Sequence, residues 1–156
     1  MAIAQEFEYF RPETVAEAVK LKADYGPKAK FLAGGTDLVV NLSDEAADPD
    51  AVIDLKGIAE LNKLELKDGI LRVGALVTFT DLIGSEPVKT IFPLLWEAAG
   101  EVANVAIRNR ATPAGNICSC VPCMDSAPAL VVYGAAVVIR GSNGEKKVPA
   151  REFFIG

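Results

Sequence analysis

Two stretches of small and polar residues in this sequence are suited to binding an anionic ligand. The first, "KFLAGGTDLVV" (30–40), places Gly34 and Gly35 between two apolar runs. Glycines let bare backbone N–H groups approach a ligand closely, and a helix beginning at Thr36 would add its positive end. We expect this turn to favour a pyrophosphate. It matches neither G-x-G-x-x-G nor a P-loop, so a tight strand-to-helix turn without a ligand is the alternative.

The second stretch, "IRNRATPAGNICSCVPCMDSAPAL", covers residues 107–130. It contains another turn of small residues, from Thr112 to Asn116, and polar side chains recur at Asn109 and Asp125. A long surface loop without a ligand would show the same composition. Whether the two turns act together depends on the elements that position them.

The composition disfavours several classes of function. The sequence has no histidine, which removes Ser–His and Cys–His nucleophile pairs and His-ligated metals. We predict no catalytic residue on this chain, so that a cofactor would supply any difficult chemistry. The formal net charge of −5, with scattered positive residues, disfavours nucleic acid and anionic membranes as partners. The N-terminus lacks the basic start and apolar core of a signal peptide, so we expect a cytoplasmic protein.

The first third of the chain predicts a small α/β lobe over residues 1–55. Apolar residues at helical spacing predict a helix over residues 11–26, with Pro12 in its first turn. Residues 28–33 and 51–55 are predicted strands, and the second is apolar enough to be buried on both faces. The glycine turn directly follows the first of these strands.

Residues 56–156 predict a second lobe of mixed α+β character. Alternating apolar and polar residues around Asp68-Gly69 predict a β-hairpin. A helix is predicted over residues 92–106, and a second hairpin is predicted to turn at Asn143-Gly144. Because 51% of all residues are apolar, the chain can bury a core.

Several motifs together resemble one family. In order come "LAGGTDLVV", "IRNxAT-x-x-GN" and an Asp nine residues after that Asn. As a set they resemble the FAD-binding (medium) subunit of molybdenum hydroxylases of the xanthine dehydrogenase and carbon monoxide dehydrogenase type. "PETVAEAV", "VIDLKGIAEL" and "LRVGALVTFTDL" agree, so the resemblance covers essentially the whole chain. It implies a two-lobed α+β fold, the FAD-binding fold of the vanillyl-alcohol-oxidase / p-cresol-methylhydroxylase type.

The resemblance implies that FAD lies between the two lobes and that both turns hold its pyrophosphate through backbone N–H groups. Asp125 matches the family's acidic residue near the nucleotide part of FAD. Thr36 or Asp37 would alternatively cap the following helix. The implied cofactor-binding residues are Leu32, Ala33, Gly34, Gly35, Thr36, Asp37, Leu38, Thr112, Ala114, Gly115, Asn116 and Asp125.

The resemblance also implies an oxidoreductase subunit that relays electrons. Its partners would be a molybdopterin-containing large subunit, where substrate is oxidised, and a [2Fe-2S] small subunit, with an acceptor such as NAD. Family members are longer, so we expect their C-terminal domain to be absent here, and a fragment that does not bind FAD is one alternative. The family's second turn usually reads Gly-Gly-Asn, so Ala114 requires a φ below zero, and Pro113 removes one donor.

Three cysteines, Cys118, Cys120 and Cys123, directly follow the second turn. An odd number so close together is a poor disulfide framework. An iron–sulfur cluster normally takes four thiolates, so we expect small, partly buried residues beside the flavin site. An iron–sulfur electron-transfer module completed by an outside ligand is the second functional alternative. Arg108 and Asn109 are expected either to brace the second turn or to form a solvated pair.

Overall fold

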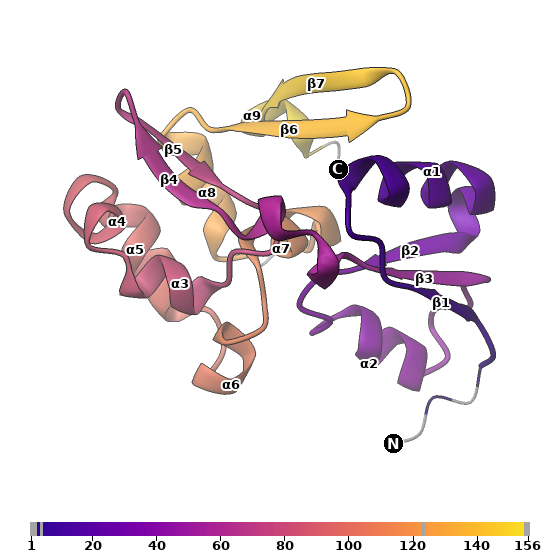
Figure 1. The fold of residues 1–156 in the computed structure, drawn as a ribbon. Helices are drawn as coiled ribbons and strands as arrows, with labels where there is room; N and C mark the ends of the chain where they lie inside the picture. Colours follow the sequence, from indigo (N-terminus) through magenta and orange to yellow (C-terminus); the bar gives the residue numbers. More distant parts are fainter. Residues whose placement is uncertain (1–2, 4, 123, 155–156) are drawn as a thin grey trace.

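The computed structural model describes residues 3, 5–122 and 124–154. Its N-terminal part is built on three short parallel strands in the order β1-β3-β2. Figure 1 shows this sheet with α1 on one side and α2 on the other. The elements are β1 (Glu8–Phe10), α1 (Val15–Tyr25), β2 (Ala29–Leu32), α2 (Leu38–Ser43) and β3 (Ala51–Asp54).

The predicted strands are confirmed, and β3 is buried along its whole length as expected for a central parallel strand. Strand β1 has no counterpart among the predicted elements, because its sequence, Glu-Tyr-Phe, is short and mostly exposed. It pairs with β3 from Glu8 opposite Ala51 onward. The order β1-β3-β2 therefore places β3 in the centre.

Both predicted helices of this part begin later than expected. Helix α1 starts at Val15 instead of near Pro12, because Thr14 is extended and its side chain accepts a hydrogen bond from the Glu17 N–H. Helix α2 starts at Leu38 instead of Thr36. The extra residues belong to the glycine turn, which is therefore longer than the sequence suggests.

Two β-hairpins belong to the rest of the chain. In the first, β4 (Leu64–Lys67) pairs with β5 (Ile70–Val73). Asp68 and Gly69 both have positive φ, 52° and 75°, as a type I′ turn requires, which confirms the predicted hairpin.

The second hairpin joins β6 (Ala136–Gly141) to β7 (Gly144–Pro149). It turns at Ser142 and Asn143, one residue earlier than predicted, because the positive φ of 102° falls on Gly144. An ion pair of 3.1 Å joins Arg140 to Glu60 on the 3-10 helix Ala59–Asn62. This pair links the hairpin to the segment that leaves the sheet (Figure 1).

Short helices fill the space between the hairpins. The predicted helix over residues 92–106 is shorter than expected and ends at Glu101. Val102 is extended and Ala103 has a φ of 40°, so the chain turns before a second short helix. The helices are α3 (Phe79–Gly84), α4 (Glu86–Ile91), α5 (Pro93–Glu101), α6 (Val105–Arg108), α7 (Pro113–Ser119), α8 (Ser126–Val132) and α9 (Ala150–Phe153).

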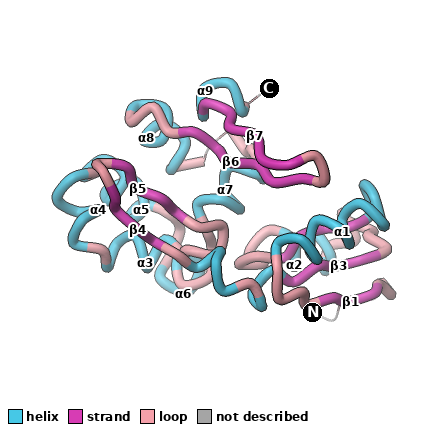
Figure 2. Tube along the Cα trace, turned by 45° about the horizontal axis from the view of Figure 1, so that its top comes forward, coloured by secondary structure: helices cyan, strands magenta, loops and turns pink. Residues whose placement is uncertain are grey.

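The buried side chains form two separate clusters. The first joins the sheet to α1 and consists of Ala18, Ala29, Ala51, Ile53 and Ile58. The second joins α3, α4, α5 and α8, and apolar side chains of the β4–β5 hairpin pack against it. Figure 2 shows α3, α4 and α5 beside this hairpin. The buried members of the second cluster are Val77, Phe79, Leu82, Val88, Leu95, Ala99, Val102, Ala111 and Ala129.

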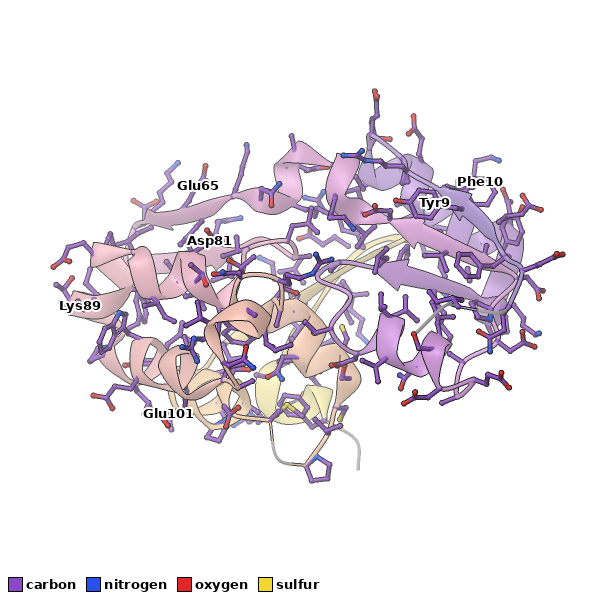
Figure 3. All side chains as sticks on the ribbon, turned by 90° about the horizontal axis from the view of Figure 1, so that it is seen from below. Tyr9, Phe10, Glu65, Asp81, Lys89 and Glu101 are labelled. Atoms are coloured by element: carbon purple, nitrogen blue, oxygen red, sulfur yellow. The ribbon has the colours of Figure 1, made fainter. Side chains whose placement is uncertain are left out.

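The two clusters lie in different parts of the molecule. Figure 3 places Tyr9 and Phe10 of β1 far from Lys89 and Glu101 of the helical part. The division at residue 55 stays a prediction, and Ile58 lies in the first cluster. Within the described ranges, no helix is long and apolar enough to cross a membrane.

Candidate functional site

The glycine turn connects the end of β2 to the start of α2. Among the described residues, the backbone N–H groups of residues 34–37 donate to no protein acceptor. Leu32 is the last residue of β2, and Leu38 is the first residue of α2. A row of unpaired donors beside a helix start is an arrangement that binds anions.

Gly35 is required by the backbone of this turn. Its φ is 78°, and a Cβ added there would lie 2.9 Å from Leu32 Cδ1 and 3.2 Å from Val39 Cγ2. The carbonyl of Gly35 accepts the Val39 N–H at 3.1 Å, which ties the turn to α2. A side chain at this position would therefore strain the conformation that exposes the donors.

At Gly34 a close contact between two backbone segments, and not a positive φ, requires glycine. A Cβ on Gly34 would lie 1.9 Å from the carbonyl oxygen of Arg110 and 3.1 Å from the Cα of Ala111. The two backbones therefore touch without a side chain between them. The Arg110 Nε donates a 3.2 Å hydrogen bond back to the Gly34 carbonyl. The tertiary structure thus brings the two predicted turns together at this contact.

The second predicted turn is the first turn of helix α7. Thr112, which is 3% exposed, caps the helix, and its hydroxyl accepts the Gly115 N–H at 2.9 Å. Pro113 is the first helical residue, where a missing N–H costs nothing. The alternative of a long surface loop is therefore wrong for these residues, because a buried Thr cap followed by Pro starts a helix.

Fewer backbone donors remain at α7 than in the glycine turn. The Gly115 N–H is used by the Thr112 hydroxyl, and the Asn116 N–H by the Thr112 carbonyl at 2.9 Å. Ala114 is not among the residues with positive φ, so its methyl group is compatible with the backbone. Within the described part of the chain, the Ala114 N–H has no protein acceptor. The glycine turn thus offers more unpaired backbone N–H groups to the candidate anion site than α7 does.

Asn116 and Asp125 are connected through Ser126. The fully buried Ser126 hydroxyl donates a 2.6 Å hydrogen bond to the Asn116 side-chain oxygen. This leaves the Asn116 amide group as the part that can donate to a ligand. Asp125 is exposed at the start of α8 and makes no capping hydrogen bond there. The structure therefore leaves the Asp125 carboxylate accessible.

Asp37 occupies the N-cap position of α2 but does not cap it. Its carboxylate instead accepts a hydrogen bond from the hydroxyl of Ser119 at the end of α7. The prediction that Asp37 or Thr36 caps α2 through its side chain is therefore wrong, because a tertiary partner takes the carboxylate. This bond is a second connection between the glycine turn and α7.

Cys118 lies near the end of α7 and Cys120 directly follows the helix, and neither is partly buried as expected. Cys118 and Cys120 are both exposed, although burial of its sulfur raises the pKa of the Cys118 thiol. Cys120 has a φ of 51° and ends the helix. Cys123 lies outside the described residues. In the part of the chain that the structure describes, no three His, Cys, Asp or Glu side chains are arranged to hold a metal ion.

Arg108 and Asn109 do not brace the second turn. The Arg108 guanidinium donates to the carbonyls of Val102 and Ala103 at 2.8 and 3.1 Å, where α5 ends. Asn109 accepts a 2.6 Å hydrogen bond from Thr80. Both residues therefore fix the path of the chain before Arg110 reaches Gly34.

A buried carboxylate lies at the same end of the sheet as the glycine turn. Asp54, 2% exposed, pairs in register with Leu32 and accepts from the Tyr9 hydroxyl and, at 2.7 Å, from the Lys56 ammonium. Burial alone would raise the pKa of Asp54, but hydrogen bonds from Lys56 and Tyr9 outweigh it and lower the pKa. The hydrogen bond to Asp54 correspondingly raises the pKa of Tyr9. With partners on both oxygens, Asp54 stabilises the end of β3.

Three residues of this region were not predicted: Arg110, Ser119 and Ser126. Arg110 occupies the unspecified position of "IRNxAT", and Ser119 lies between two cysteines. Neither position therefore belongs to a motif that predicts a role for its side chain. Ser126 directly follows Asp125, and its burial is a tertiary property. Their roles follow from their hydrogen-bond partners, which are 76, 82 and 10 positions away for Arg110, Ser119 and Ser126.

Residues 5–156 match the family described as the FAD binding domain in molybdopterin dehydrogenase. The chain belongs to this family. This confirms the predicted family, the predicted cofactor FAD and, with the structural neighbours below, the predicted two-lobed α+β fold.

Relatives and solved structures agree with this membership. The chain is 39% identical over 149 residues to a xanthine dehydrogenase FAD-binding subunit of Escherichia coli O157:H7, covering 95% of the chain and 51% of the relative. It is 38% identical over 154 residues to a carbon monoxide dehydrogenase medium chain of Hydrogenophaga pseudoflava, covering 99% and 54%. These relatives are dehydrogenase subunits, in agreement with the predicted oxidoreductase subunit.

Solved structures of related enzymes share the fold of this chain. Carbon monoxide dehydrogenase from Hydrogenophaga pseudoflava superposes with a TM-score of 0.96 at 37% identity, over 100% of this chain and 54% of that chain. Quinoline 2-oxidoreductase from Pseudomonas putida 86 superposes with a TM-score of 0.94 at 30% identity, over 100% and 54%. The chain therefore spans about half the length of these relatives.

Proposed function

We propose that this chain is the FAD-binding part of a subunit that relays electrons in a molybdenum-containing hydroxylase or dehydrogenase. In this proposal the glycine turn, from Leu32 to Leu38, holds the pyrophosphate of FAD together with Thr112, Ala114, Gly115 and Asn116. Asp125 would lie near the nucleotide part. Bound FAD would supply one- and two-electron redox chemistry, and no acid or base from this chain would be needed.

The observation that carries the proposal is the row of unpaired N–H groups over residues 34–37. A pyrophosphate offers several acceptor oxygens, which match a row of donors beside a helix start. Gly35, at a φ of 78°, holds the turn in the conformation that exposes them. Family membership supplies the identity of the anion, because the family is described by FAD binding.

The electron partners are the finer part of the proposal. We propose that electrons reach this chain from a [2Fe-2S] small subunit, after substrate oxidation on a molybdopterin-containing large subunit, and leave to an acceptor such as NAD. The relatives are named as a medium chain and an FAD-binding subunit, which supports assembly with other chains. A cytoplasmic location belongs to the same proposal and rests on the sequence alone.

The test is an absorbance spectrum of the purified chain followed by an FAD titration. We expect flavin bands or saturable binding at one FAD per chain, and no binding by a Gly35→Val variant that remains folded by circular dichroism. A folded chain that binds no FAD at micromolar concentrations would overturn the proposal for this chain and favour the fragment without FAD binding. Among the residues that the structure describes, no observation favours an iron–sulfur module, because no three His, Cys, Asp or Glu side chains there are arranged to hold a metal ion.

A further inference from the structure

We propose that Arg110 is a positioning residue for FAD, and that its Nε–H group holds the glycine turn in place before the cofactor binds. The inference rests on the proposed FAD function and assigns a role within it to a residue outside the implied cofactor-binding set. Arg110 would act through Gly34 and would not itself need to touch the cofactor.

The backbones of Gly34 and Arg110 lie in direct contact. A Cβ on Gly34 would meet the Arg110 carbonyl oxygen at 1.9 Å and its carbonyl carbon at 2.6 Å. The Arg110 Nε–H then donates to the Gly34 carbonyl at 3.2 Å, across 76 positions in the sequence. The side chain of Arg110 thus folds back over the same contact that its backbone makes.

Arg110 belongs to a segment that backbone hydrogen bonds hold in place. Its backbone N–H donates to the Ile107 carbonyl at 2.9 Å, and the Ala111 N–H donates to the same carbonyl at 2.7 Å. The Ala111 carbonyl in turn accepts from the N–H of the fully buried Phe79 at 3.0 Å. The segment is therefore anchored in the second core cluster.

The glycine turn itself has few internal hydrogen bonds. The N–H groups of residues 34–37 have no protein acceptor among the described residues. Its carbonyls and side chains supply the connections: Gly35 to Val39, Asp37 to Ser119, and Gly34 to Arg110. The last two reach the part of the chain that carries α7. Arg110 therefore supplies one of the two hydrogen bonds that hold the glycine turn beside α7.

Two matched variants separate the hydrogen bond from the charge. In Arg110→Gln the side-chain amide nitrogen occupies the place of Arg Nε, so the donor is kept and the charge is lost. In Arg110→Lys a methylene group occupies that place, so the charge is kept and the donor there is lost. Arg110→Ala removes both. Arg110 is exposed, so none of these changes opens a cavity.

Each variant is titrated with FAD, and binding is measured by the quenching of flavin fluorescence. Thermal unfolding of the FAD-free chain serves as the control for folding. Arg110→Ala and Arg110→Lys are expected to raise the Kd for FAD about three- to tenfold, as for the loss of one hydrogen bond. Arg110→Gln is expected to stay within about twofold of the unaltered chain. If Arg110→Ala does not fold, the Kd values of Arg110→Gln and Arg110→Lys for FAD are compared alone, and a weaker-binding Lys variant supports the inference.

Two results would overturn the inference. One is an unchanged Kd in both Ala and Lys variants. The other is a Gln variant as weak as Ala together with a Lys variant that binds normally, because the charge would then be the cause. If the unaltered chain binds no FAD, the proposed function itself fails, which is a distinguishable outcome.

Discussion

The Ser126 hydroxyl donates a 2.6 Å hydrogen bond to the Asn116 side-chain oxygen and joins the start of α8 to α7. Ser126 is fully buried, so the bond is shielded from water. It places Asp125, the neighbouring residue, at a defined position relative to α7. The polar residues of the second motif are therefore connected through a serine outside the motif.

Removal of this hydroxyl tests the connection. Ser126→Ala is expected to lower the free energy of unfolding by about 1–2 kcal/mol, because the Asn116 oxygen loses its donor in a partly buried place. Urea denaturation of the FAD-free chain measures this. Ser142→Ala, in the exposed turn of the β6–β7 hairpin, serves as the control and is expected to change little. Equal stability of both variants would contradict a role for the Ser126 hydroxyl.

The glycine turn gives a second prediction. Gly35→Ala places a Cβ at a φ of 78° and 2.9 Å from Leu32 Cδ1, so we expect a loss of about 1–2 kcal/mol in stability and weaker FAD binding. Gly35→Val should abolish FAD binding. Denaturation and FAD titration measure the two effects.

Gly100→Ala is the matched control for Gly35→Ala. Gly100 lies within α5, and nothing lies within 4 Å of a Cβ added there. We expect this change to raise stability by about 0.5–1 kcal/mol, because alanine favours a helix, and to leave FAD affinity unchanged. Normal FAD affinity in Gly35→Val would exclude the turn from the pyrophosphate site.

Asp125 gives a third prediction that separates binding from folding. Asp125→Ala should weaken FAD binding without lowering the thermal unfolding temperature, since the carboxylate is exposed and makes no capping hydrogen bond. Glu65→Ala is the control for the change in net charge, because Glu65 is exposed on β4 (Figure 3) and is not one of the proposed FAD-binding residues. An Asp125→Ala variant with unchanged Kd for FAD would remove Asp125 from the proposed site.

The lowered pKa of Asp54 predicts that its contribution to the free energy of unfolding is lost in acid. Its pKa is lowered in the folded chain, so its ionised form stabilises the fold above the ordinary value of about 3.9. That stabilisation is lost as the pH falls through the lower folded pKa. We therefore expect the difference in unfolding free energy between the unaltered chain and Asp54→Asn to shrink as the pH falls from 5 towards about 2.5.

Tyr9→Phe provides a control for this pH effect. It removes one of the hydrogen bonds to Asp54 while keeping the carboxylate and the Lys56 ion pair. We expect its pH dependence to lie between those of the unaltered chain and Asp54→Asn. A pH-independent difference for Asp54→Asn would show that the carboxylate stabilises the fold through packing alone.

Local patterns determined much of the fold. Alternation around Asp68-Gly69 predicted the first hairpin and its turn, because both residues accept positive φ. The apolar run Ala51–Asp54 predicted a strand buried on both faces. Helix starts were less accurate, since Thr14 and the glycine turn depend on capping and on tertiary partners.

The sequence by itself determined the family, the cofactor and the two motifs, because short motifs in a fixed order carry that information locally. Only the tertiary structure decided that the second motif starts a helix, that Gly34 packs on the Arg110 carbonyl, and that Asp37 is held by Ser119. The last two are contacts between residues 76 and 82 positions apart in the chain. Such contacts depend on how the elements pack together, and no local pattern of residue types encodes them.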